Sequence, residues 1–277
     1  MTINKFKVLL GFVMIISTGF YFNYFFPKSA QTKELVMNEI PKRNLQLVEK
    51  FISKYPGWEI AFYDEFNDSV LNDAWTALER ADKYNNELQV YKKENVHLAG
   101  GRLLLIGKNE NQTYTSGLVQ TKGNQDILYG KVEVKAKYPA GKGLFPAIWL
   151  LRSDDQDALP EIDILESVGD DPEVVYMVHH WKENGVKNRI YNTSTVKTFD
   201  QDHLYSLEWE PNEIRWYIDG NLVFSSNENV PDVPMYVIIN LAIGGNWPGS
   251  PDESTVFPAE FSIDYVKIYR KVGGVNG

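Results

Sequence analysis

The 277-residue sequence contains no cysteine. This absence excludes disulfide bonds, thiolate metal sites, a cysteine nucleophile and a lipidated N-terminal cysteine, and it says nothing about compartment. Positive charge is also scarce, because 28 lysines and arginines face 37 aspartates and glutamates, for a formal net charge of -9. Nucleic-acid-binding proteins present a basic patch, so the charge balance argues against a nucleic-acid partner.

Several catalytic motifs are missing as well. The chain has no Gly-x-Ser-x-Gly elbow, no Walker loop and no His-Glu-x-x-His, which leaves a serine esterase, a P-loop enzyme and a zinc protease without support. It has only four histidines, and the adjacent pair His179 and His180 would point to opposite sides of a strand. The pair is therefore a poor set of metal ligands.

The N-terminus carries an uncharged apolar run, Val8 to Phe26, preceded by Lys5 and Lys7. We interpret residues 1–27 as a signal peptide or an N-terminal membrane anchor, since the run approaches the ~20 residues that span a bilayer. No small-x-small cleavage site follows, which favours the anchor and an extracellular or cell-surface location. Cleavage and a buried core helix are the alternatives.

Residues 28–57 are predicted to form a spacer. Apolar residues recur there at helical spacing after Pro41, which predicts a short amphipathic helix.

From residue 58 to residue 272 the pattern is that of short strands separated by turns. Residues 130–137 alternate between apolar and polar, Asp219-Gly220 is typical of a hairpin turn, and residues 236–243 form a continuous apolar run that fits an inner strand. No long helical pattern follows residue 57. The sequence predicts an all-β sandwich or jelly roll, with Trp209 and Trp216 in its core.

Three carboxylates lie within six residues in Glu161-Ile-Asp-Ile-Leu-Glu166. In a strand Glu161 and Asp163 share a face, whereas Glu166 breaks the alternation. A β-bulge near Ile164 and Leu165 would return Glu166 to the acidic face, and bulges are common beside active sites. The alternative is a half-buried strand with a solvated acidic face.

Two carboxylates on one β-face suit glycoside hydrolysis, in which one attacks the anomeric carbon and the other protonates the leaving oxygen. Retention needs the carboxyl groups about 5–5.5 Å apart, whereas strand positions four apart are separated by about 13 Å, so the spacing alone does not establish the mechanism. Asp163 would hydrogen-bond the nucleophile, and crowded like charges would keep one carboxyl protonated. A calcium site built from Asp163 and Glu166 would leave the aromatic residues, 13% of the chain, unexplained.

Residues 58–271 resemble glycoside hydrolase family 16, and within it the laminarinase-like endo-β-1,3-glucanases and the lichenase-like enzymes. The centre of the resemblance is the Glu-x-Asp-x-x-Glu signature at 161–166. Further matching blocks, in family order, are Tyr63-Asp-Glu-Phe66, Asn86-Glu-Leu-Gln89, Tyr114-Thr-Ser-Gly117, Tyr129-Gly130, residues 141–151, Trp216-Tyr-Ile-Asp-Gly220, residues 240–249, Phe257-Pro258 and Ile263-Asp-Tyr-Val266.

The resemblance implies a concanavalin-like jelly-roll sandwich of two curved antiparallel sheets, with a cleft across the concave one. It implies a retaining double displacement with Glu161 as nucleophile, Glu166 as acid/base and Asp163 as the assisting carboxylate. No cofactor is expected for catalysis, although Asp264 matches a position that often holds a structural calcium ion. The positions that match residues lining the sugar subsites are Asn86, Glu87, Trp149, His179 and Trp247.

Each of these positions also has a simpler interpretation. Trp149 lies among Ala, Ile and Leu and could belong to the core, whereas Trp247 lies in a Gly-Gly-Asn-Trp-Pro-Gly loop, where a core role is rare. Either His179 or His180 would face the cleft, and alternation cannot choose between them without the strand register. Asn86 and Glu87 could be turn residues, and Asp264 an ordinary surface residue.

Two segments beside the signature depart from the family pattern. The loop at 153–160 lacks the usual Trp and Gly residues, and His179-His180-Trp181 stands where laminarinases often have His-Tyr-Gly. The loop carries Asp154, Asp155 and Asp157, which would repel sulfated or uronic polysaccharides and so favour a neutral glucan. An ordinary solvated loop explains these charges equally well.

Together these features predict an exported, membrane-tethered, monomeric endo-glycosidase that cuts β-1,3- or β-1,3/1,4-linked glucan with retention. The alternatives are a transglycosylase, a hydrolase of another β-linked polysaccharide such as galactan or exopolysaccharide, and a β-glucan-binding protein without catalysis.

Overall fold

The computed structural model describes residues 55–154, 156 and 158–272. The predicted signal or anchor at 1–27, nearly all of the spacer at 28–57, and the loop residues Asp155 and Asp157 lie outside the described residues. Within the described part, no helix has the length and apolar character needed to cross a bilayer.

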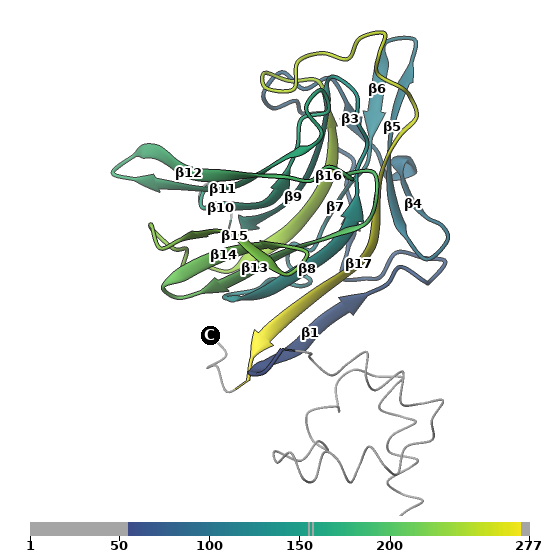
Figure 1. Ribbon diagram of the computed structural model, residues 1–277. Helices are drawn as coiled ribbons and strands as arrows, with labels where there is room; N and C mark the ends of the chain where they lie inside the picture. The colour runs from purple at the N-terminus through teal and green to yellow at the C-terminus, as the bar shows by residue number, and fades with distance from the viewer. Residues whose placement is uncertain (1–54, 155, 157, 273–277) are drawn as a thin grey trace, which may run out of the picture. The chain divides into compact units, whose positions relative to one another are not determined.

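The described chain folds into two β-sheets packed face to face (Figure 1). The larger sheet has ten strands in the order β15-β14-β13-β8-β17-β5-β6-β3, with β1 paired to β17 and β4 to β5. Its strands are β1 (Trp58–Asp64), β3 (Val90–Tyr91), β4 (Val96–Leu98), β5 (Leu103–Glu110), β6 (Thr113–Ser116), β8 (Gly130–Lys137), β13 (His203–Glu210), β14 (Glu213–Ile218), β15 (Asn221–Ser226) and β17 (Ala259–Lys271).

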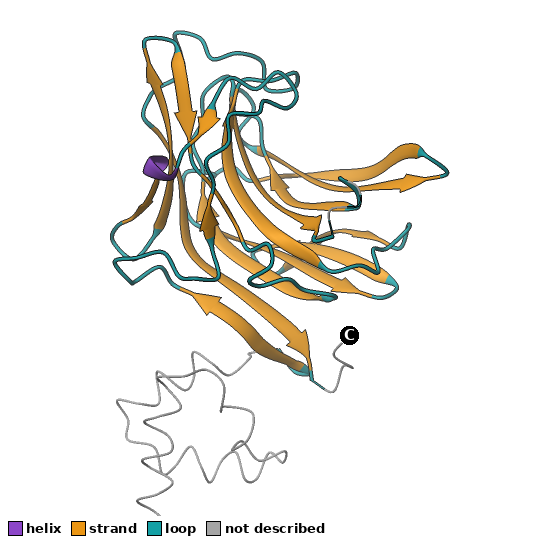
Figure 2. Cartoon of the chain, turned by 180° about the vertical axis from the view of Figure 1, so that it is seen from behind, coloured by secondary structure: helices purple, strands orange, loops and turns teal. Residues whose placement is uncertain are grey.

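The smaller sheet has seven strands in the order β12-β11-β10-β9-β16-β7-β2, and its free face is the concave one (Figure 1). Its strands are β2 (Thr76–Ala77), β7 (Leu118–Gln120), β9 (Leu144–Arg152), β10 (Glu161–Glu166), β11 (Val174–Glu183), β12 (Val186–Thr195) and β16 (Met235–Ile243). Among the described strands only β3 and β6 pair in parallel. The one helix in this part of the chain is a 3₁₀ turn, η1 (Lys93–Asn95), seen from behind in Figure 2.

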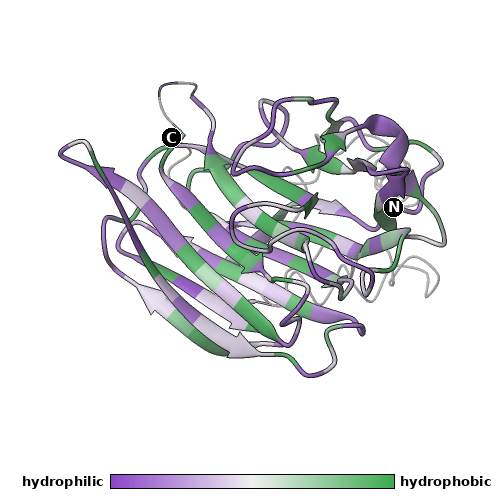
Figure 3. Cartoon of the chain, turned by 90° about the horizontal axis from the view of Figure 1, so that it is seen from above, coloured by the Kyte–Doolittle hydropathy of each residue, from purple (hydrophilic) through white to green (hydrophobic). Residues whose placement is uncertain are grey.

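The hydrophobic core fills the space between the two sheets. Alternate residues of β8, such as Val132 and Val134, point into it, and the colours in Figure 3 alternate along the strands accordingly. Because strand side chains alternate with period two, each sheet buries one face and leaves the other for solvent or ligands.

Strand β16 departs from this alternation because every residue in it is buried. Val237 and Ile239 face the main core, whereas Tyr236 and Ile238 belong to a second apolar cluster with Tyr91 on the other side of the sheet. The strand lies between β9 and β7, so the inner strand predicted from its apolar run is confirmed.

Trp209 and Trp216 are both 1% exposed, as predicted for core residues. The indole Nε1 of Trp209 donates a 3.0 Å hydrogen bond to the carbonyl of Pro231. Trp216, on β14 of the ten-stranded sheet, donates a 2.8 Å hydrogen bond to the backbone carbonyl of Asp163 on β10 of the other sheet. This bond crosses the core and fixes β10 in the middle of its acidic signature.

Candidate active site

The strand β10 contains the predicted bulge. Along the neighbouring β9, Glu161 pairs with Leu151 and Glu166 with Ala147, and the register shifts between Asp163 and Leu165. The register along β11 shifts between Asp163 and Glu166. Five steps along β10 therefore match four along each neighbour, which returns Glu166 to the face of Glu161.

A cavity of about 590 Å³ lies over this face of the seven-stranded sheet. Four of the predicted site residues line it: Glu161, Glu166, Glu87 and Trp247. Its other lining residues are Asn85, Phe145, Tyr176, Val178, His180, Arg189, Tyr191, Gly244, Gly245, Asn246 and Pro248.

The three carboxylates of β10 form an electrostatically unfavourable group. Burial raises the pKa of Glu161 well above its ordinary value, and the charge of Asp163 raises it further. Burial also raises the pKa of Glu166, which the charges of both Asp163 and Glu161 then raise again. The charges of Asp163 and Glu161 thus both favour the protonated form of Glu166.

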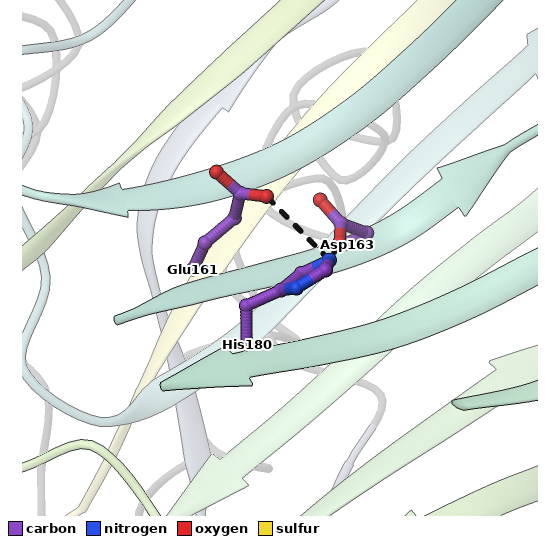
Figure 4. Close-up of side chains that lie close together, drawn as sticks. All are labelled: Glu161, Asp163 and His180. Atoms are coloured by element: carbon purple, nitrogen blue, oxygen red, sulfur yellow. Dashed lines mark ion pairs between the residues drawn. The ribbon is translucent and has the colours of Figure 1, made fainter. Parts of the chain in front are cut away.

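Asp163 lies between the two glutamates and is only 2% exposed. Burial raises the pKa of its carboxyl, and the neighbouring His180 counteracts this shift. The Nε2 atom of His180 lies 3.4 Å from Asp163 Oδ2 and 3.8 Å from Glu161 Oε1 (Figure 4). One imidazole thus lies against the two carboxyl groups at the start of the signature.

The strand register settles which of the two histidines faces the cleft. His180 pairs with Glu161, whereas His179 pairs with Ile162, a core residue. The prediction of His179 as a subsite residue is therefore corrected to His180.

His179 is fully buried on the core side, where its ring lies 5.0 Å from the ring of Trp181. Neither ring nitrogen has a hydrogen-bond partner. Burial lowers the pKa of His179 to about 4, and the nearby His180 contributes to the shift. The residue is thus neutral at ordinary pH.

Trp247 is 47% exposed and forms part of an aromatic wall. Its ring makes edge contacts with Tyr176, at a centroid distance of 4.8 Å, and with Phe145, at 5.3 Å. Tyr176 pairs with Glu166 across β11 and β10, so the wall stands beside the predicted acid. A flat apolar ring held on edge by two others presents a rigid surface to a sugar ring.

Trp149 points to the same side of the sheet as Asp163, its partner across β9 and β10. It is half-buried and packs against the second apolar cluster. Its Nε1 atom donates a 2.7 Å hydrogen bond to Asn240 Oδ1, and Asn240 Nδ2 donates one of 3.1 Å to the Tyr91 hydroxyl. Trp149 itself does not line the cavity. The two hydrogen bonds hold the indole of Trp149 in place on the acidic face of the sheet.

Glu87 lines the cavity and forms an isolated β-bridge with Gly244, in the segment that leads to Trp247. Burial raises the pKa of its carboxyl, although a 2.6 Å hydrogen bond from Gln89 Nε2 opposes the shift. Asn86 does not line the cavity. Its Nδ2 donates a 2.7 Å hydrogen bond to Asn246 Oδ1 and so braces the loop that does.

The surroundings of Asp264 fit a calcium ion poorly. Lys135 Nζ lies 2.7 Å from Asp264 Oδ2, and Arg102 Nη1 lies 3.8 Å from Oδ1. Two cationic side chains already neutralise this carboxylate, which leaves it a poor ligand for a further cation. The calcium ion predicted at Asp264 stays a prediction. In the described chain the residues with metal-ligand spacing are Glu161, Asp163 and His180, whose ligand atoms lie within 4.8 Å of one another.

Sequence reasoning missed Tyr176, Arg189 and Tyr191 as cavity residues. Arg189 and Tyr191 alternate along β12, which is a visible signal, but alternation alone does not show which face meets the cleft. The pairing of Tyr191 with Val178, and of Val178 with Asp163, places them on the acidic face.

Comparison with known proteins agrees with this geometry. The family model described as "Glycosyl hydrolases family 16" matches residues 75–267. A β-glucanase of Rhodothermus marinus is 34% identical over 79% of this chain and 87% of its own length. A glucan endo-1,3-β-glucosidase of Niallia circulans is 32% identical over 78% of this chain, which spans 38% of that protein.

Solved structures show the same likeness. The laminarinase from Rhodothermus marinus superposes with a TM-score of 0.72 at 32% identity, covering 79% of this chain and all of that one. The laminarinase catalytic domain from Thermotoga maritima gives 0.71 at 32% identity, covering 78% and 99%. The predicted jelly-roll sandwich is confirmed, and the chain belongs to glycosyl hydrolase family 16.

Proposed function

We propose that the protein is a retaining endo-β-glucanase acting on β-1,3- or mixed β-1,3/1,4-linked glucan. The observation that carries the proposal is that Glu161 and Glu166 open into one cavity from a single bulged strand. The names of the related proteins, a β-glucanase and a glucan endo-1,3-β-glucosidase, support glucan as substrate.

In the first step the ionised Glu161 attacks the anomeric carbon. The bond from that carbon to the glycosidic oxygen breaks, and the proton of Glu166 passes to the departing oxygen. A covalent ester between the sugar and Glu161 forms. The charge of Asp163 raises the pKa of Glu166 and so favours the protonated form that the first step needs.

In the second step Glu166, now ionised, removes a proton from water, which attacks the anomeric carbon from the side that the leaving group vacated. The ester bond to Glu161 breaks and the carboxylate returns. Two inversions leave the configuration unchanged, and Glu166 has its proton again.

The substrate assignment is tested by incubating the purified protein with laminarin, lichenan, agarose, xyloglucan and an exopolysaccharide, followed by measurement of new reducing ends and product sizes. Internal cleavage of laminarin or lichenan is expected. Cleavage of none would reject hydrolysis, and products longer than the starting oligosaccharides would indicate a transglycosylase.

The two glutamate roles are separated by azide. With an aryl β-glycoside of a glucan oligosaccharide, Glu161→Ala with azide should yield a glycosyl azide of inverted configuration, because azide replaces the missing nucleophile. Glu166→Ala should yield the azide of retained configuration, because azide then attacks the intact ester. The opposite pairing would exchange the two roles.

Export and tethering belong to the same proposal. The uncharged run at 8–26 after two lysines supports a membrane anchor with the β-domain outside the cell. Cell fractionation should recover the intact chain with the membrane, and protease added to whole cells should remove the β-domain. Recovery of the protein in the cytoplasm would contradict this part.

A further inference from the structure

A row of cations lies on the cleft face of the hairpin formed by β11 and β12. Arg189 pairs with His180, and His180 with Glu161, so the three residues are direct neighbours across three strands. Two pairs further along the hairpin, Lys187 stands opposite Lys182. Directly opposed strand residues share a face, so all of these side chains emerge on the acidic face of the sheet.

Arg189 and Lys187 have no evident structural role in this hairpin. In residues 55–154, 156 and 158–272, Arg189 and Lys187 make no hydrogen bond or ion pair, whereas the Arg102, Arg152 and Arg215 guanidinium groups are each held by carboxylates. The guanidinium of Arg189 instead lies 5.7 Å from the ring centroid of Tyr191.

The aromatic ring beside the cations is itself open to the cleft. Tyr191 is 56% exposed and lines the cavity together with Arg189. An exposed ring next to a guanidinium that donates no hydrogen bond within the described residues offers an apolar surface for a sugar ring and two parallel donors for a planar or tetrahedral oxyanion.

We infer that Arg189, Lys187 and Tyr191 form a subsite for a β-glucan unit that carries an acidic substituent, a carboxylate or a sulfate. The inference rests on the proposed function, because the same cleft must hold the glucan chain. The shared chemistry is an oxyanion on a sugar ring. A net charge of -9 makes a basic row at the cleft a local exception on this protein.

A purely electrostatic role toward the catalytic acids is the competing explanation. The charge of Lys187 lowers the pKa of Glu161, and that of Arg189 lowers the pKa of Glu166, in both cases against the larger effect of burial. Such a role would affect every substrate alike. Discrimination between acidic and neutral glucans therefore separates the two explanations.

The sequence predicted that the acidic loop at 153–160 repels anionic polysaccharides. The charge of Asp154 in this loop does not act against binding of an anion at the subsite. Arg152 holds both carboxylate oxygens of Asp154, with Nη2 2.7 Å from Oδ2. This contact lowers the pKa of Asp154 and neutralises its charge locally. The sequence-based expectation of a neutral glucan is thus weakened at this position.

The experiment uses the full chain and three forms of laminarin: unmodified, with a fraction of its primary hydroxyls oxidised to carboxylates, and with a fraction sulfated. The value of kcat/KM is measured for each form at about 20 mM and about 300 mM salt, because screening weakens exposed charge interactions. The acidic-to-neutral ratio should exceed one at low salt and fall at high salt. The form with the higher ratio identifies the anion.

The Lys187→Gln/Arg189→Gln double variant should lower that ratio about tenfold, the effect of losing charge-assisted hydrogen bonds. The matched control is Lys197→Gln, which removes an exposed lysine outside the cavity lining and should leave the ratio unchanged. A wild-type ratio of one or less, or equal losses on all three glucans in the double variant, would overturn the subsite alone. Failure to cleave the unmodified glucan would instead overturn the proposed function.

Discussion

Two regions of the sandwich bury carboxylates on strand faces, but they surround these carboxylates with opposite kinds of neighbour. In the cleft, Asp163 lies between Glu161 and Glu166, and the pKa of every member of the group is raised. On the outer face of the ten-stranded sheet, Glu133 is fully buried, yet Lys131 Nζ lies 3.7 Å from its carboxylate.

The outer group is satisfied by partners. The Tyr269 hydroxyl donates a 2.7 Å hydrogen bond to Glu133, and Tyr55 donates a second. Burial acts to raise the pKa of the neighbouring Glu208, but hydrogen bonds from Lys131 and Tyr217 outweigh it and leave the pKa below its usual value. A buried carboxylate with donors is a stable structural charge, whereas one surrounded by other acids holds a proton that it can transfer.

The strongest test of this contrast is Glu161→Gln. Turnover of glucan should fall by roughly 10⁴-fold or more, since the nucleophile is lost. The free energy of unfolding at pH 7 should stay the same or rise, because one of three crowded charges has been removed. Steady-state kinetics and urea denaturation measure the two effects, and an active or clearly destabilised variant would contradict the contrast.

Glu133→Gln should show the reverse pattern. The change removes a buried charge from between Lys131 and two tyrosine hydroxyls, which should cost about 3 kcal/mol of unfolding free energy. Activity at 25 °C should be unchanged, because the residue lies on the face opposite the cleft. Urea denaturation gives the stability, and a variant as stable as the wild type would show that the outer network is not a stabilising one.

His179 extends the comparison to a buried group of the other charge type. Its folded pKa of about 4 lies below the ordinary 6.5. As pH falls below 6.5, His179 binds a proton in the unfolded state but not in the folded state. The contribution of His179 to the free energy of unfolding is therefore fully present above pH 6.5 and is lost progressively down to pH 4. The lost stability amounts to about 3 kcal/mol.

His179→Phe should abolish this contribution, so the difference in unfolding free energy between the wild type and the variant should change by that amount between pH 7 and pH 4. Because the carboxylates titrate equally in both proteins, the difference isolates the histidine. A difference independent of pH would mean that His179 is not held neutral.

The smallest effect is expected for Trp247→Ala. Losing the apolar surface that covers one sugar ring, on the order of 40 Å², should cost about 1 kcal/mol of binding and raise KM roughly fivefold. Stability should change little, since the side chain is 47% exposed. Leu222→Ala, an exposed apolar residue on β15, is the control, and an unchanged KM for Trp247→Ala would remove this ring from the subsites.

The local features of the fold could be predicted from the sequence because they depend on neighbouring residues. Alternation predicted the two faces of β8, the apolar run predicted the inner strand β16, and the broken alternation at Glu166 predicted the bulge. The family signature supplied the two glutamates of the site.

What could not be predicted depends on pairing between distant segments. The choice between His179 and His180, and the cleft position of Arg189, follow from the register of β10, β11 and β12, which no local pattern specifies. The hydrogen bond from Trp216 to the carbonyl of Asp163 crosses between sheets. The sequence marked this tryptophan as core but not as a support for the catalytic strand.

The bulge in β10 also bears on insertions and deletions during evolution. Losing one residue from a strand normally turns every later side chain to the wrong face. If Ile164 were lost, the three acids would stand at every second position of the strand and share one face without a bulge. The segments of β9 and β11 that pair with Glu161 to Glu166 are already only four steps long. A chain one residue shorter would therefore keep its three acids on the cleft face.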